Sequence, residues 1–143
     1  MSQLAKDVLV VDDDEHIRNL IAIALTRAGL SVDTAADGLC AVEHLTVKTY
    51  TVLLLDLSMP RLDGAGVLEE IRAFHRPGDE RPIVLVMTAA TEREPLASVA
   101  EMVQAVITKP FDVHDLRELV QDCVLGRQRY GIVGSVPEVR ISG

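Results

Sequence analysis

The stretch Thr51–Asp56, with the sequence TVLLLD, decides the fold class of this 143-residue chain. Residues 51–55 form an unbroken run rich in aliphatic side chains, and a single carboxylate follows it. Helices cover both faces of a parallel sheet, so its strands carry continuous apolar runs rather than alternating polar and apolar residues. The stretch therefore predicts a buried parallel strand that ends at Asp56.

Similar apolar runs and helical patterns alternate along the rest of the chain. The other predicted strands cover residues 8–11, 30–32, 83–87 and 105–108. The predicted helices cover residues 15–28, 37–47, 64–74, 94–102 and 112–125. Their apolar stripes include Leu20 and Leu39; Gly29 is expected to end the first helix and Asp112 to cap the last. Five strands alternating with five helices predict an α/β fold, a three-layer αβα sandwich.

Composition and charge exclude several classes of protein. The chain is 48% hydrophobic and long enough to bury a core without disulfides or a structural metal. Its net charge of −8 argues against direct binding of nucleic acid. It has no apolar run near the ~18 residues that span a bilayer, and residues 1–7 lack a signal-peptide core. Cys40 and Cys123 share no metal-ligand spacing, so we expect buried thiols in a reducing cytoplasm.

The composition changes near residue 127. Residues 127–143 carry three arginines against one glutamate, which leaves a net charge of −10 on residues 1–126. The second segment also has little helical periodicity. We therefore expect one domain over residues 1–126 and a C-terminal tail or linker over residues 127–143.

Chemically distinctive residues stand where the predicted strands end. Asp12 and Asp13, Asp56, Thr88 and Lys109 each lie at or just past a strand terminus. The carboxyl ends of parallel strands share one edge of a sheet, where ligands bind. Five residues that are far apart in the sequence are therefore expected to meet in one site.

Together these residue types suit phosphoryl transfer. Crowded carboxylates repel one another, and a hard cation such as Mg²⁺, which takes oxygen ligands, removes the conflict. A lysine and a threonine hydroxyl can bind phosphoryl oxygens, and a carboxylate can itself form an aspartyl-phosphate. Asp56 stands alone at the end of the most apolar strand, so it is the better candidate for the nucleophile.

Four short motifs in this order resemble those of the response regulator receiver domain. They are Val10–Asp14 (VVDDD), Leu55–Gly64 (LDLSMPRLDG), Met87–Ala89 (MTA) and Thr108–Phe111 (TKPF). The resemblance covers roughly residues 6–125. It implies a flavodoxin-like (βα)5 fold whose parallel sheet has the strand order 2-1-3-4-5.

The resemblance also implies a role for each residue of the expected site. Asp56 is the phosphoacceptor and a metal ligand, Asp13 binds Mg²⁺ directly, and Asp12 binds it mainly through water. The backbone carbonyl of Ser58 is a further metal ligand, and Mn²⁺ is the alternative ion. Lys109 bridges to Asp56 and then to the phosphoryl group.

Two further features are implied near Lys109. Thr88 moves its hydroxyl toward the phosphoryl oxygen and so reports the phosphorylated state. The peptide bond between Lys109 and Pro110 is expected to be cis.

The family also implies a place in two-component signalling. The phosphoryl donor is a sensor histidine kinase or a histidine phosphotransfer protein, and the domain switches partner binding in the cytoplasm. It is not an enzyme acting on an external metabolite, because it catalyses only its own phosphorylation and dephosphorylation. The output is expected from a downstream protein or from a C-terminal output domain outside this chain. A homodimer is compatible with the family, and no direct contact with nucleic acid or membrane is expected.

The sequence departs from the family pattern before Lys109. Val106 stands where an aromatic switch residue is usual, Met102 where glycine is usual, and Gln104-Ala105 where an acidic-glycine pair is usual. Phosphorylation is therefore expected to be read out differently, through the fourth helix or through the tail.

Two other functions compete with the receiver. A haloacid dehalogenase-type phosphatase also has acids after its first strand, but His16 stands where its threonine belongs and no cap domain is evident. The other alternative is a receiver-shaped interaction module that is never phosphorylated, which Val106 favours and the retained Asp56, Lys109 and Thr88 oppose.

Overall fold

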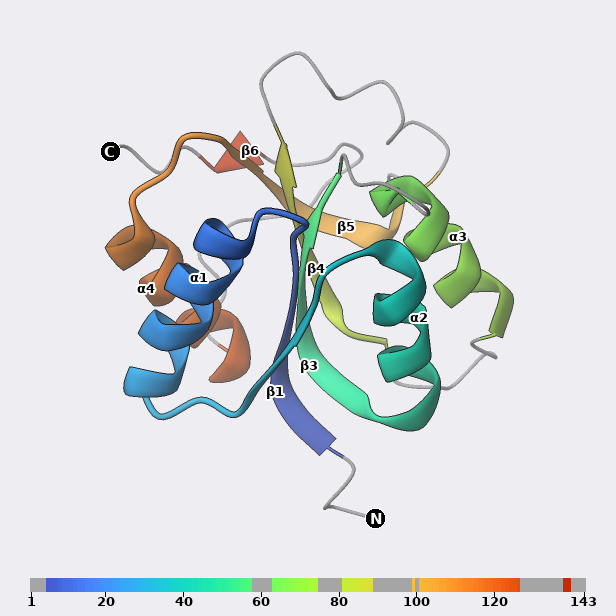
Figure 1. The fold of residues 1–143 in the computed structure, drawn as a ribbon, viewed down its shortest axis with the longest axis horizontal. Coiled ribbons are helices and arrows are strands. Elements are labelled where there is room, and N and C mark those ends of the chain that lie inside the picture. Colours follow the sequence, from blue (N-terminus) through green and yellow to red (C-terminus); the bar gives the residue numbers. More distant parts are fainter. Residues whose placement is uncertain are drawn as a thin grey trace.

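The computed structural model describes residues 5–57, 63–74, 81–88, 99, 101–126 and 138–139. Its strands form one parallel sheet, in the order β2-β1-β3-β4-β5-β6 (Figure 1). The strands are β1 (Ala5–Val11), β2 (Val32–Ala35), β3 (Thr49–Asp56), β4 (Ile83–Thr88), β5 (Val103–Thr108) and β6 (Glu138–Val139). The helices are α1 (Glu15–Arg27), α2 (Gly38–Val47), α3 (Gly64–Phe74) and α4 (Val113–Val124).

The predicted strand order 2-1-3-4-5 is confirmed, and a sixth strand extends it. β6 pairs in parallel with β5, with Glu138 opposite Val106 and Val139 opposite Ile107. A two-residue strand has no periodic pattern, so the sequence did not indicate it. The division into a domain over residues 1–126 and a tail over residues 127–143 stays a prediction.

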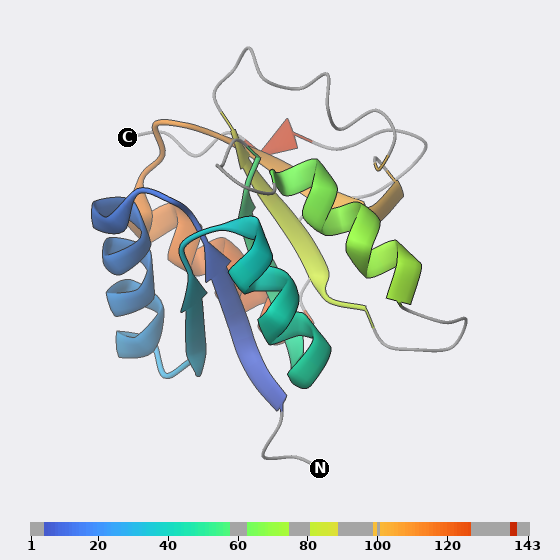
Figure 2. The same ribbon diagram turned by 45° about the vertical axis from the view of Figure 1, so that its right-hand side comes forward.

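Helices cover both faces of the sheet, as the continuous apolar runs require. α1 and α4 lie against one face, whereas α2 and α3 lie against the other (Figures 1 and 2). Along β3, Val52 and Leu54 belong to the core under α1 and α4, and Leu53 and Leu55 to the core under α2 and α3. All four are fully buried, which confirms the three-layer sandwich.

The helix ends follow from local side-chain chemistry. Asp14 caps α1, because its carboxylate accepts hydrogen bonds from the backbone N–H groups of His16 and Ile17. Asp112 caps α4 in the same way, as predicted. Gly29 follows α1 with a φ of +91°, the left-handed conformation that ends many helices.

Two sequence predictions need correction, and a third is mostly untested. The second strand covers Val32–Ala35 rather than residues 30–32, because its polar residues Asp33 and Thr34 concealed an edge strand. Leu20 and Leu39 are 52% and 41% exposed, so they lie outside the buried stripes of α1 and α2. The face of each helix that packs against the sheet is therefore narrower than its stripe of apolar residues. The helix predicted over residues 94–102 lies mainly outside the described residues.

Among the described residues, no helix combines the length and the apolar character needed to cross a membrane.

Candidate functional site

The predicted site residues converge at the carboxyl edge of the sheet. Asp12 and Asp13 follow β1, Asp56 and Thr88 are the last residues of β3 and β4, and Lys109 follows β5. Adjacent strands keep these ends together, since Asp56 pairs with Met87 and Thr88 with Thr108. The Lys109 backbone N–H donates to the Thr88 carbonyl at 2.8 Å, and this hydrogen bond joins the ends of β4 and β5.

Three carboxylates form the centre of the site. One oxygen from each of Asp12, Asp13 and Asp56 lies within 4.8 Å of the others. Asp12 is fully buried and Asp56 is 5% exposed, whereas Asp13 is exposed. Clustered carboxylate oxygens, one of them open to solvent, fit the needs of Mg²⁺, which keeps part of its water shell. The donor set therefore fits the metal implied by the sequence.

Lys109 supplies the positive charge opposite these carboxylates. Its ammonium nitrogen lies 3.1 Å from Asp12 Oδ2 and 3.5 Å from Asp56 Oδ2. Burial alone would lower the pKa of Lys109, but the charges of Asp56 and Asp12 outweigh it and raise that pKa above its ordinary value. Lys109 is therefore a cation at neutral pH and holds the two buried carboxylates together.

The loop after β1 is held by hydrogen bonds to Asp12. Asp12 Oδ1 accepts from the Asp14 backbone N–H at 2.9 Å, and Oδ2 faces Lys109. The Arg18 guanidinium donates to the Asp12 carbonyl at 2.9 Å. Both side-chain oxygens of Asp12 therefore have protein partners, which leaves Asp13 more available for a cation. Sequence reasoning missed Arg18, because only the fold of this loop brings the side chain back over Asp12.

Gly64 allows α3 to begin directly beside Asp56. A Cβ atom at this position would lie 2.8 Å from the Asp56 carbonyl oxygen and 2.8 Å from the Leu57 Cα. The Gly64 N–H donates to the Leu57 carbonyl at 2.9 Å, and the Leu57 N–H donates to the Met87 carbonyl at 2.9 Å. Glycine is needed here for close approach of two backbones, which fixes the end of β3.

The remaining predicted features have different outcomes. The Lys109–Pro110 peptide is cis, as the resemblance implied. Val106 is 2% exposed, so the position expected to hold an aromatic switch residue holds a buried aliphatic side chain. Ser58, predicted to offer its carbonyl to the metal, lies outside the described residues.

Gln104, at which the sequence departs from the family pattern, has a structural role in the sheet. The register between β4 and β5 shifts between Val84 and Leu85, where Val103 and Ala105 are the partners and Gln104 is the additional residue. The Gln104 side-chain oxygen accepts from the Val84 N–H at 2.6 Å. The Gln104 side chain therefore adds a hydrogen bond between β4 and β5 at the bulge.

Comparison with known proteins decides the family. Residues 8–121 match the response regulator receiver domain. This chain belongs to that family. Receiver domains of response regulators act in two-component signalling, and the acidic cluster of this receiver domain lies at the phosphorylation site of the family. The match favours the receiver over the phosphatase alternative.

Regulatory proteins from bacteria are among the relatives of this receiver domain. It is 31% identical over 131 residues to the transcriptional regulatory protein QseB of Haemophilus influenzae, covering 92% of this chain and 57% of that protein. It is 37% identical over 120 residues to the DNA-binding transcriptional regulator NtrC of Klebsiella pneumoniae, covering 80% of this chain and 24% of that protein. The chain thus spans about half or less of the length of these relatives.

Solved receiver structures have the same fold. The response regulator protein TrrA of Thermotoga maritima, in complex with Mg(2+)-BeF, is 29% identical with a TM-score of 0.69, covering 82% of this chain and 98% of that one. The receiver domain of a sensor histidine kinase from Pseudomonas aeruginosa, with magnesium in its active site cleft, is 27% identical with a TM-score of 0.72, covering 84% and 98%.

Proposed function

We propose that Asp56 accepts a phosphoryl group from a phosphorylated histidine of a sensor histidine kinase or a histidine phosphotransfer protein. The observation that carries this proposal is the position of Asp56, buried at the end of β3 beside two other carboxylates and 3.5 Å from Lys109. The Asp56 oxygen attacks the phosphorus, so that an O–P bond forms and the P–N bond to the imidazole breaks. The electron pair and a proton end on the imidazole nitrogen, which leaves a neutral histidine.

The acidic cluster supports a magnesium requirement. Asp13 and Asp56 would hold Mg²⁺ directly, Asp12 through water, and Ser58 through its backbone carbonyl, with Mn²⁺ as the alternative ion. A bound divalent cation neutralises charge that develops on the phosphoryl oxygens. The magnesium in the two similar receiver structures supports this assignment.

Lys109 and Thr88 couple the new charge to the surrounding strands. The ammonium of Lys109, now held by Asp12 and Asp56, is close enough to pair with a phosphoryl oxygen on Asp56. Thr88 is buried on the adjacent strand, and its hydroxyl would donate to another phosphoryl oxygen. New contacts of this kind shift a two-state equilibrium and thereby change the surface that partners bind.

The wider role follows from the relatives. We propose that the domain switches a downstream protein or a C-terminal output domain outside this chain, and that its catalysis is limited to its own phosphorylation and dephosphorylation. Regulators such as QseB, much longer than the region matched here, support an attached output. Two free cysteines support a location in the reducing cytoplasm. We propose in addition that the domain can form a homodimer.

Phosphorylation with a small donor tests the acceptor. The protein is incubated with acetyl phosphate and Mg²⁺, and its intact mass is read with and without EDTA. We expect the gain of one phosphoryl group in Mg²⁺, none in EDTA, and none in Asp56→Asn. Glu70→Gln, which removes one negative charge from an exposed position on α3, is the matched control and should be phosphorylated normally.

A purified histidine kinase of broad specificity provides the second donor. Phosphorylation by either donor that persists in Asp56→Asn would refute Asp56 as the acceptor. No phosphorylation by either donor would favour the alternative of a receiver-shaped module that acts without phosphate.

A further inference from the structure

A pocket lies at the opposite edge of the sheet from Asp56. The starts of β1, β3 and β4 and the end of α2 surround a cavity of about 360 Å³. The described residues that line it are Ala5, Lys6, Leu45, Lys48, Thr49, Tyr50, Thr51, Arg81, Pro82 and Ile83. A volume of this size falls within the range of small-molecule sites, roughly 300–1,000 Å³.

The lining of this pocket has a charge opposite to that of the whole chain. The chain has a net charge of −8 and three lysines, of which Lys109 belongs to the acidic site. The other two, Lys6 and Lys48, line this pocket together with Arg81. No aspartate or glutamate is among the described lining residues. Both lysines outside the acidic site therefore line one pocket, together with an arginine.

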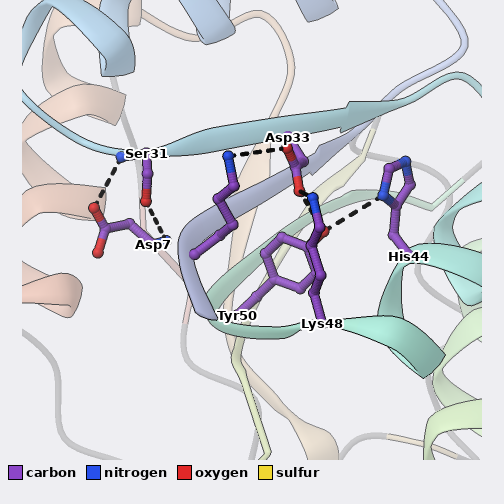
Figure 3. Close-up of polar contacts among 7 residues, drawn as sticks. Asp7, Ser31, Asp33, His44, Lys48 and Tyr50 are labelled. Carbon is purple, nitrogen blue, oxygen red and sulfur yellow. Dashed lines mark hydrogen bonds and ion pairs between the residues drawn. The ribbon is translucent and has the colours of Figure 1, made fainter. Parts of the chain in front are cut away.

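A single carboxylate that is not part of the lining contacts both lysines. Asp33 of β2 lies 3.5 Å from the Lys6 ammonium and 3.0 Å from the Lys48 ammonium. The Tyr50 hydroxyl donates to the same carboxylate at 2.6 Å, and His44 lies 3.4 Å from that hydroxyl (Figure 3). One negative charge is shared by two positive ones, so this group keeps an excess of positive charge.

The lysines are also more accessible than the carboxylate that holds them. The side chains of Lys6 and Lys48 are 32% and 29% exposed, whereas that of Asp33 is 16% exposed. Asp33 therefore orders two lysine side chains that remain partly exposed. Ordered donors bind with a smaller loss of side-chain entropy than free surface lysines.

Lys6, Lys48 and Arg81 carry three positive charges and Asp33 carries one negative charge, so these four residues have a net charge of +2. A phosphate monoester carries nearly two negative charges above its second pKa of about 6. Arginine binds phosphate through two parallel hydrogen bonds, and lysine binds it as a point charge. Leu45, Pro82 and Ile83 add apolar surface beside these cations. We propose that this pocket binds a small organic dianion, namely a phosphate monoester with an apolar substituent.

Binding of phenyl phosphate tests the proposal. The full chain is titrated at pH 8 in EDTA, so that no divalent cation is available at the acidic site, and backbone amide shifts are followed by NMR. We expect saturable shifts confined to Lys6, Lys48–Thr51 and Ile83. Inorganic phosphate should bind more weakly, because it lacks the apolar group, and phenol should not shift these signals, because it lacks the charge. Shifts centred on Asp56 and Lys109, or equal shifts with phenol, would overturn the proposal.

Three variants separate the pocket from general electrostatics. Lys48→Gln should weaken binding of phenyl phosphate about tenfold, the effect of losing one charge-assisted contact. Arg27→Gln removes the same charge from the end of α1 and should leave the affinity unchanged. The backbone amide spectrum of Lys48→Gln away from the pocket residues shows that this variant is folded. Equal affinity in Lys48→Gln and wild type would refute the site. Because Asp56→Asn should bind phenyl phosphate normally, the result does not depend on the proposed phosphorylation.

Discussion

The ammonium of Lys109 lies 3.1 Å from a carboxylate oxygen of Asp12, although 97 positions separate the two residues in the sequence. Asp12 is fully buried, so this ion pair compensates a charge that has no contact with solvent. Lys109 also reaches Asp56 at 3.5 Å, which links the buried carboxylate to the proposed phosphoacceptor. The lysine therefore has a structural role before any phosphoryl group is present.

Lys109→Met should expose this structural role. Removal of the ammonium leaves Asp12 and Asp56 without their cation, and we expect a loss of about 2 kcal/mol in the free energy of unfolding in EDTA. A divalent cation can replace part of the missing charge, so the loss should shrink in saturating Mg²⁺. Thermal unfolding of both proteins in EDTA and in Mg²⁺ measures the effect. An equal loss under the two conditions would contradict it.

The neighbouring aspartates Asp13 and Asp14 should have separable effects. Asp14→Ala removes the cap of α1 and should cost about 1 kcal/mol in stability while the increase in Tm caused by Mg²⁺ is retained. Asp13→Asn should abolish that increase and should lose little stability in EDTA. The increase corresponds to about 2.7 kcal/mol in the free energy of unfolding at a hundredfold excess of Mg²⁺ over Kd. Calorimetric titration with Mg²⁺ provides a direct check. Similar behaviour of the two variants would reject Asp13 as the ligand.

Substitution of Gly64 should affect both stability and phosphorylation. In Gly64→Ala the new methyl group meets backbone atoms of Asp56 and Leu57 at 2.8 Å, so the end of β3 has to move. We expect a loss of about 1–3 kcal/mol and slower phosphorylation by acetyl phosphate. Gly29→Ala is the control. Its φ of +91° makes alanine strained, but nothing lies within 4 Å of the added carbon, so stability alone should fall.

The hydrogen bond between Tyr50 and Asp33 should give a pH-dependent stability difference. Burial alone would raise the pKa of Asp33, but the Tyr50 hydroxyl and the lysines Lys48 and Lys6 outweigh it and lower that pKa. A lowered pKa in the folded state stabilises the protein above the ordinary value of about 3.9, and the contribution is lost as the pH falls through the folded value. Tyr50→Phe should therefore cost about 1.5 kcal/mol at pH 6 and less below pH 4.

Urea unfolding of Tyr50→Phe and wild type between pH 3 and pH 7 measures this dependence. A difference that stays constant over the whole range would mean that the ionised form of Asp33 is not what Tyr50 stabilises.

Local patterns were enough to predict most strands and helices, because a continuous apolar run or a 3.6-residue repeat is visible within ten residues. They failed at β2, where Asp33 and Thr34 occupy the strand. Asp33 is acceptable there only because Lys6, Lys48 and Tyr50 come from β1, the end of α2 and β3 to surround it. Such compensation depends on pairing between distant segments, and no local pattern contains it.

The sequence by itself determined the α/β class and the residues of the acidic site, because parallel strands place their carboxyl ends on one edge and those ends are readable from the chain. Tertiary structure alone decided which groups touch. Sheet register and loop packing put Lys109 against Asp12 as well as Asp56, and they put Gly64 against the Asp56 carbonyl. They also gathered Lys6, Lys48 and Arg81 into one pocket. Contacts of a few ångströms depend on how separate segments pack, and the spacing of residues along the chain does not encode the distances between those segments.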